Sequence, residues 1–159
     1  MNQRALAAVL LGGALLPLSA AFQVPKALLP SAVLGVAPAH AATPLAPSLQ
    51  GKPVLVEIYA SWCPACQQVQ PVLESVRDRE GDAIHLVQFD VSSPASARRS
   101  AARADELGLG AFYRSHRSQT SLVGILDPGT GASVATFRAQ TALSPYLTAI
   151  DKTRSLISR

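Results

Sequence analysis

Both cysteines of this 159-residue chain, Cys63 and Cys66, lie within one short stretch, and the two flanks of that stretch differ in periodicity. Residues 54–59 (VLVEIY) form an apolar, strand-like run just before it. Residues 67–76 (QQVQPVLESV) follow it with apolar side chains at helical spacing. A strand that leads into C-x-x-C at the start of a helix is an arrangement for exchanging electrons between thiols and disulfides. The chain must therefore form a strand, a tight turn and a helix in succession at this point.

The two cysteines are expected to have different roles. One helical turn brings the two sulfurs within bonding reach, and the positive end of the helix dipole favours a thiolate at Cys63. Cys63 is therefore the predicted nucleophile, and Cys66 is placed to resolve the mixed disulfide. Pro64 suits the first helical turn, where its missing N–H has no partner to lose.

Two alternative roles of the cysteine pair, zinc binding and a structural disulfide, have less support in the sequence. A structural zinc ion needs four ligands, and the histidines that remain (His40, His85 and His116) have no spacing typical of such a site. A disulfide that closes so short a loop removes little entropy from the unfolded chain, so it would stabilise the fold poorly. Redox activity is the favoured interpretation.

The segment 54–76 resembles the active-site strand and helix of the thioredoxin superfamily, with W-C-P-A-C where thioredoxins have W-C-G-P-C. Glu57, six residues before Cys63, stands where thioredoxins carry a buried aspartate, and Pro71 matches the proline that bends their helix. The resemblance implies a protein thiol–disulfide oxidoreductase whose redox-active disulfide, Cys63–Cys66, is its own reaction centre, without a diffusible cofactor or a metal.

Glu57 and Trp62 are further candidates beside the cysteines. A carboxyl on the strand beneath the helix would hold its proton tightly and could relay that proton to or from Cys66. The alternative for Glu57 is a solvated strand residue on the face shared with Leu55 and Tyr59. Trp62 is expected either to cover the redox face or simply to pack.

The resemblance also points to one departure. Thioredoxins place a cis-proline opposite the cysteines, and alignment of residues 122–126 puts Thr120, followed by Ser121, at that place. A cis bond before a non-proline residue costs about 2.5–4 kcal/mol, so this peptide is expected to be trans. The residues expected to contact a substrate chain are Trp62, Pro64, Thr120 and Ser121. An iron–sulfur or other metal-handling variant is a minor alternative.

Residues 1–41 are typical of an export signal. Arg4 supplies positive charge before an apolar segment at residues 5–16, and Pro17 follows. Small-residue cleavage sites occur at residues 19–21 and 39–41, of which the second is favoured. The alternative is an uncleaved membrane anchor, although the apolar stretch is slightly short for a span. Both interpretations place the domain outside the cytoplasm, in a periplasm or thylakoid lumen.

The remainder is expected to be a linker over residues 42–51 and one domain over residues 52–159, long enough for a single core. Residues 43–48, with two prolines, are typical of a flexible tether. Without Arg4 and Lys26 the formal charge falls from +4 to +2, which is too small to indicate nucleic-acid binding.

The fold is predicted to be α/β, a thioredoxin-like three-layer sandwich with a mixed sheet of about four strands. The element order is βαβαββα. Ser93 is a predicted helix N-cap, as is Ser144. The family's first strand and helix are expected to be missing. The predicted strands are residues 54–60, 84–91, 122–127 and 132–138, and the predicted helices are 64–79, 93–108 and 144–155.

Residues 108–120 have no clear place in this order. They could form a partner-recognition loop with Phe112 and Tyr113 as anchors, or a helix extension whose aromatics join the core.

The predicted function is an exported thiol–disulfide oxidoreductase, with Glu57 moving the proton. We expect a reductant rather than an oxidant, acting on cysteine-containing proteins and exchanging electrons with a membrane donor or acceptor. The alternatives are a non-catalytic assembly factor that uses residues 108–120, and the metal-handling variant.

Overall fold

The computed structural model describes residues 43–159. The predicted leader, with its two cleavage sites and the alternative membrane anchor, lies outside these residues. Within residues 43–159 no helix is both long enough and apolar enough to span a bilayer.

Four strands form one sheet in the order β2-β1-β3-β4. β1 and β2 are parallel, whereas β3 is antiparallel to both of its neighbours. The mixed sheet of four strands predicted from the sequence is thus confirmed. The strands are β1 (Val54–Tyr59), β2 (His85–Asp90), β3 (Leu122–Leu126) and β4 (Ser133–Arg138). The helices are α1 (Pro64–Glu80), α2 (Pro94–Glu106), α3 (Gly110–His116) and α4 (Leu143–Ile157), with 3₁₀ turns η1 (Pro47–Leu49) and η2 (Gly81–Ala83).

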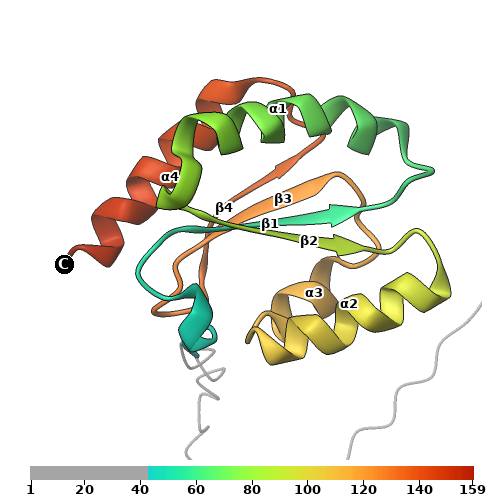
Figure 1. Ribbon diagram of the computed structural model, residues 1–159, viewed down its shortest axis with the longest axis horizontal. Helices are drawn as coiled ribbons and strands as arrows, with labels where there is room; N and C mark the ends of the chain where they lie inside the picture. The colour runs from blue at the N-terminus through green and yellow to red at the C-terminus, as the bar shows by residue number, and fades with distance from the viewer. Residues whose placement is uncertain (1–42) are drawn as a thin grey trace, which may run out of the picture. The chain divides into compact units, whose positions relative to one another are not determined.

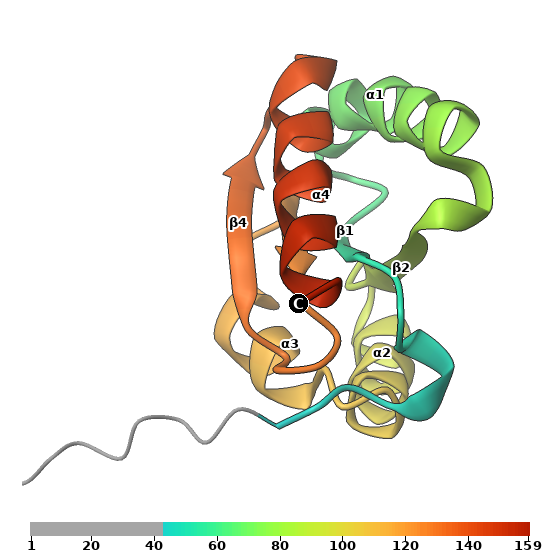
Figure 2. The same ribbon diagram turned by 90° about the vertical axis from the view of Figure 1, so that its left-hand side faces the viewer.

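Helices cover both faces of the sheet, which makes three layers (Figures 1 and 2). α1 and α4 lie on one face, and α2 and α3 lie on the other (Figure 1). Alternation along β1 sends Leu55 into the cluster with α1 and α4, and Val56 into the cluster with α2 and α3. Because β1 lies between two other strands and is covered on both faces, it is apolar almost throughout.

Gly124 of β3 lets α3 lie close to the sheet. A Cβ at this position would come 2.6 Å from two ring carbons of Phe112. The ring therefore occupies the space that a side chain on β3 would fill. Phe112 and Tyr113 belong to the same cluster of buried residues.

The N-termini of α1 and α2 have the residues that the sequence predicted there, whereas the N-terminus of α4 does not. Pro64 opens α1, and Ser93 caps α2 through a reciprocal pair of hydrogen bonds with Ser96. The prediction that Ser144 caps the last helix is wrong, because α4 already begins at Leu143. Its N-cap residue, Ala142, has no side chain that accepts a hydrogen bond.

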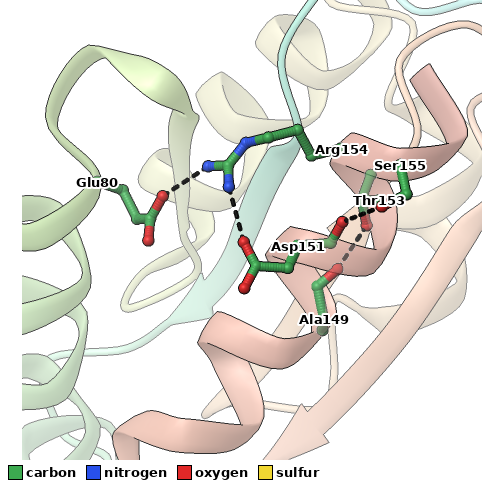
Figure 3. A network of polar contacts seen from close by, with 6 residues as sticks. All are labelled: Glu80, Ala149, Asp151, Thr153, Arg154 and Ser155. Carbon is green, nitrogen blue, oxygen red and sulfur yellow. Dashed lines mark hydrogen bonds and ion pairs between the residues drawn. The ribbon is translucent and has the colours of Figure 1, made fainter. Parts of the chain in front are cut away.

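A polar network joins the end of α1 to α4 (Figure 3). The Arg154 guanidinium lies 2.7 Å from a carboxylate oxygen of Glu80 and 2.7 Å from one of Asp151. The hydroxyls of Thr153 and Ser155 donate to backbone carbonyls one turn earlier. The network lies on the side of the sheet that α1 and α4 cover (Figures 1 and 3).

The flexible tether predicted over residues 43–48 is wrong from residue 45 onward, and the predicted linker over residues 42–51 is folded there as well. Leu45 and Leu49 are buried, and Leu49 is the last residue of η1. The Leu45 N–H donates to the Pro128 carbonyl at 2.9 Å, and the Gln50 amide donates to the carbonyls of Leu45 and Pro128. Folded structure therefore begins before residue 52.

Residues 108–120 contain α3, an element that the predicted order lacked. Phe112 is 8% exposed and Tyr113 is 2% exposed, so the aromatics join the core as the helix-extension interpretation required. The alternative, in which these two side chains project from the surface as partner anchors, is wrong because both are almost fully buried.

Candidate functional site

The two cysteines lie at the turn from β1 into α1 as unpaired thiols. Cys63 is the N-cap residue of α1, and its sulfur accepts the Cys66 N–H at 3.3 Å. Cys63 is 7% exposed, whereas Cys66 has no exposed surface. The sulfur of Cys63 therefore occupies the place where a serine or aspartate oxygen usually caps a helix.

Cys63 is surrounded by groups that favour its thiolate. Burial raises the pKa of Cys63, but hydrogen bonds from the Thr120 side chain, the Cys66 thiol and the backbone of Cys66 and Ala65 outweigh burial, so that its pKa is lower than the usual value of 9.0. A lower pKa makes the nucleophile available nearer neutral pH.

The surroundings of Cys66, in contrast, disfavour its thiolate. Burial, followed by the hydrogen bond with Cys63, raises the pKa of Cys66 to about 11. The Cys66 thiol also lies 4.0 Å from the Ile58 carbonyl oxygen. The buried thiol therefore keeps its proton while its neighbour ionises, which is the asymmetry expected of an attacking and a resolving cysteine.

Thr120 and Ser121 lie opposite the cysteines, as the alignment with residues 122–126 implied. The Thr120 side chain hydrogen-bonds with Cys63. Ser121 is buried, donates its N–H to the Ile58 carbonyl at 2.9 Å, and has a φ of 64°. Such a φ is costly for a residue with a Cβ and often occurs beside functional sites. Thr120 is thus open to a substrate, whereas Ser121 is not, which corrects its place among the predicted contact residues.

Trp62 lies on the surface beside the motif and is 62% exposed. Its indole N–H donates to the Ser92 carbonyl at 3.1 Å, and the Ser61 N–H donates to the Ser92 hydroxyl oxygen at 2.8 Å. Ser92 in turn donates its N–H (2.7 Å) and its hydroxyl to Asp90. The hydrogen bond from the Ser92 hydroxyl lowers the pKa of Asp90, which keeps this acceptor ionised. The loop after β2 thereby fixes the orientation of Trp62.

Glu57 is buried in β1 on the face that α1 covers, and is 2% exposed. The Gln70 amide donates to its two carboxylate oxygens at 2.8 and 3.0 Å, and the Gln88 amide donates to one of them at 2.8 Å. Burial raises the pKa of Glu57, and the bonds from Gln88 and Gln70 offset only part of that rise. The alternative of a solvated strand residue is wrong.

No hydrogen bond joins Glu57 to Cys66 among residues 43–159. A small hollow of about 180 Å³ leads from Glu57 between α1 and β2, and Glu74 and Arg77 also line it. A proton that passes between the carboxyl and the sulfur must therefore cross a gap through water or through a side-chain movement.

A groove of about 450 Å³ lies beside the cysteines on the face of the sheet that α2 and α3 cover. Trp62 forms one wall, residues within 91–97 form a second, and residues within 113–120 form the third. Thr120 both lines the groove and contacts Cys63, so the groove starts at the nucleophile. Pro64 is exposed at the first turn of α1 but does not line it.

Several residues of the site gave no signal in the sequence. Gln70 and Gln88 cannot be distinguished in the sequence from other polar surface residues, and the helix-cap segment that contains Ser92 does not indicate its contact with Trp62. Within residues 43–159 no group of three histidine, cysteine, aspartate or glutamate side chains is placed to hold a metal ion.

Comparison with known proteins identifies similar chains. The thioredoxin family model matches residues 45–103. A thioredoxin of Mycolicibacterium smegmatis is 44% identical over 50 residues, which cover 30% of this chain and 45% of that protein. A thiol:disulfide interchange protein TxlA homolog of Synechocystis is 38% identical over 58 residues, which cover 36% of this chain and 32% of that protein. The chain thus spans less than half the length of these two curated relatives.

The similar solved structures are more distant in sequence than these relatives. A structure of MTB dsbF, in mixed oxidized and reduced forms, has a TM-score of 0.48 at 19% identity and covers 67% of this chain and 84% of its own. The exposed lipoprotein thioredoxin Etrx1 of Streptococcus pneumoniae has a TM-score of 0.48 at 17% identity, with coverages of 66% and 87%.

Proposed function

We propose that the chain is a member of the thioredoxin superfamily, whose family model matches residues 45–103, and that it is a thiol–disulfide oxidoreductase that reduces disulfides in protein substrates. The observation that carries this proposal is the asymmetry of the two thiols. Cys63 keeps 7% of its surface exposed and has a lowered pKa, while Cys66 is fully buried and its pKa is raised to about 11.

The reaction has two exchange steps. The Cys63 thiolate attacks one sulfur of the substrate disulfide, a Cys63–substrate disulfide forms, and the other substrate sulfur leaves as a thiolate. Cys66 then loses its proton and attacks the Cys63 sulfur, which releases the second substrate thiolate. The protein is left with a Cys63–Cys66 disulfide, and the substrate has gained two electrons and two protons.

Cys66 needs a base because its pKa of about 11 leaves little thiolate at neutral pH. We assign this role to Glu57, the buried carboxyl whose pKa burial raises above its ordinary value, so that it holds a proton more readily than a solvated carboxylate. The proton then leaves toward solvent through the hollow beside Gln70 and Gln88. Glu57 acts on the second step alone.

The direction, the location and the partners are parts of the same proposal. Superfamily potentials range from about −270 mV for thioredoxin to about −120 mV for a strong oxidant. The C-P-A-C spacing and the signal-like residues 1–41 support a reductant in a periplasm or thylakoid lumen. Its substrates would be cysteine-containing proteins, and a membrane donor would restore its thiols.

Single-cysteine variants test the exchange mechanism. In an assay of insulin-disulfide reduction by the full-length chain, Cys63→Ser should lose activity to the uncatalysed level. Cys66→Ser should instead accumulate mixed disulfides, because the second step is blocked. Trapping on a gel without reductant separates the two variants.

The assembly-factor alternative predicts a different result. It requires partner binding that survives in both cysteine variants, and no turnover by the native protein. Titration of the native protein against glutathione buffers then gives the reduction potential, and a value near the oxidising end of the range would overturn the reductant direction.

A further inference from the structure

We propose that the groove beside Cys63 binds a substrate segment with an acidic residue near its target disulfide, and that Arg117 selects this residue. The inference rests on the proposed thiol–disulfide exchange and names a substrate class for the same site.

The groove is placed and sized for a peptide segment. It starts at Thr120, whose side chain contacts Cys63, and it extends between Trp62 and the end of α3. Its volume of about 450 Å³ lies in the range of protein ligand sites, about 300–1,000 Å³. A chain that presents a disulfide to Cys63 would therefore continue into this groove.

Most polar groups in the groove walls already have partners inside the protein. The Trp62 indole N–H donates to the Ser92 carbonyl, and the Tyr113 hydroxyl donates to the Ala97 carbonyl at 2.8 Å. The Ser93 hydroxyl oxygen accepts the N–H of Ser96 as the helix cap. These side chains supply packing surface, but they have little capacity left to choose between charged and neutral substrates.

Arg117 differs from these residues in both charge and freedom. It is exposed, it is the charged residue in the groove lining, and no acidic side chain lines the groove with it. The ion pairs found within residues 43–159 involve Arg114 and Arg154 and leave the Arg117 guanidinium unpaired. An unpaired guanidinium at the rim of a groove favours a carboxylate, which it can bind through two parallel hydrogen bonds.

The backbone of Arg117 is held in place by the core. Its N–H donates to the Tyr113 carbonyl at 2.8 Å at the end of α3. α3 is fixed to the sheet by the buried rings of Phe112 and Tyr113. The Arg117 charge is also close enough to Tyr113 to counteract part of the rise that burial causes in the pKa of this phenol. Because Arg117 also lines the groove, its side chain lies at the groove rim.

A set of peptide disulfides tests the selection. Each substrate is a disulfide-linked pair of identical neutral peptides with one cysteine, in which a single Glu, Gln or Lys is moved through the positions on either side of the cysteine. The reduced full-length chain consumes one peptide disulfide and releases two peptide thiols, which are quantified by chromatography after acid quenching. At low ionic strength the best-placed Glu peptide should react about two- to fivefold faster than its Gln counterpart, and the Lys peptide more slowly than either.

Charge variants provide the controls. Arg117→Gln should remove the preference for Glu, Arg117→Glu should reverse it in favour of Lys, and about 0.5 M salt should reduce it in the native protein. Arg114→Gln is the matched control on the same helix, because Arg114 pairs with Asp105 at 2.8 Å outside the groove, and it should keep the native preference.

Two results overturn the inference: equal rates for the three peptides at every position, or a preference for Glu that Arg117→Gln leaves unchanged. The absolute rate with the Gln peptide reports separately on the proposed function. If this neutral peptide reacts no faster with the protein than with free glutathione, the oxidoreductase proposal fails, whatever the charge ratio shows.

Discussion

The face of the sheet under α1 and α4 holds the Glu57 carboxyl in a closed environment, whereas the face under α2 and α3 opens into the groove beside Cys63. Glu57 is surrounded by α1 and β2 and bound by two amides. The groove is lined by surface residues and carries the unpaired Arg117. Cys63 lies in the turn between β1 and α1, and Cys66 lies in the first turn of α1, next to both environments. Proton handling and substrate contact can therefore be altered one at a time.

The sharpest form of this comparison is the difference between the two thiols. Cys63, beside the groove, has a pKa below 9.0, and Cys66, inside the helix, has a pKa of about 11. At pH 7 the thiolate fraction should therefore differ by about 100-fold or more, because each pKa unit is a factor of ten. Iodoacetamide should alkylate Cys63 at least about 100-fold faster than Cys66, as measured by mass spectrometry of the reduced protein over a range of pH.

Denatured protein is the control for this experiment, because unfolding should make the two rates converge. Equal rates in the folded protein, with both cysteines titrating near their ordinary value, would remove the basis for assigning Cys63 as nucleophile and Cys66 as resolving thiol.

The sequence predicted the redox motif and most of the fold because those features depend on local spacing. C-x-x-C between a strand and a helix and the Ser93 cap have short-range signals, whereas the sequence left open whether Glu57 is buried or solvated. The partners of Glu57 had none, because Gln88 reaches it across the β1–β2 pairing and Gln70 from the facing helix.

Two errors in the prediction have a common cause. Residues 45–50 look like a proline-containing tether, and Phe112 and Tyr113 look like exposed anchors, when each segment is considered alone. Leu45 and Leu49 become buried only because residues distant in sequence cover them, and Phe112 fits against the sheet only because Gly124 has no side chain. Such contacts depend on tertiary packing, which local patterns do not encode.

Gly124 allows the groove side to be disturbed without touching the cysteines. In Gly124→Ala the new Cβ would meet the Phe112 ring at 2.6 Å, so α3 must shift away from the sheet. Overpacking of this kind typically costs about 1–3 kcal/mol in the free energy of unfolding, measurable by urea denaturation. Preference for acidic peptides should weaken as α3 moves, while selective alkylation of Cys63 persists.

Phe112→Leu in the Gly124→Ala background is the matched test of this explanation. A smaller side chain at position 112 should restore part of the lost stability, so that the two substitutions are less than additive. Full additivity would mean that the Gly124 effect does not arise from the contact with Phe112.

Glu57→Gln disturbs the other side of the sheet, with an expected effect smaller than that of Gly124→Ala because hydrogen bonds from Gln88 and Gln70 offset part of the burial cost. The pKa of Glu57 in the folded protein lies above its ordinary value of 4.5. Its stabilising contribution is therefore complete below about pH 4.5 and is lost as the pH rises through the raised pKa.

The free energy of unfolding of the native protein should consequently fall, relative to that of Glu57→Gln, as the pH rises from 4.5. Urea denaturation of both proteins across this range measures the difference. Glu74→Gln, an exposed change beside the same hollow, should follow the native protein. If the difference in unfolding free energy between the native protein and Glu57→Gln does not vary with pH, burial does not raise the pKa of Glu57.

The smallest effect is expected at Arg154, on the same side as Glu57 but in the network that joins α1 to α4 (Figure 3). Arg154→Gln removes two ion pairs, one to Glu80, which is 13% exposed, and one to the largely exposed Asp151. Exposed pairs contribute about 0–1 kcal/mol each, so the loss of two pairs should lower the unfolding free energy by less than about 2 kcal/mol, and the effect should shrink as salt is added. Urea denaturation at two salt concentrations measures this loss, with Asp151→Asn as the matched variant that leaves the Glu80 pair in place.

Neither substitution should change the alkylation ratio of the cysteines or the peptide preference, since the network belongs to the scaffold and does not contact the site. A change in either would show that the two sides of the sheet are coupled through α1.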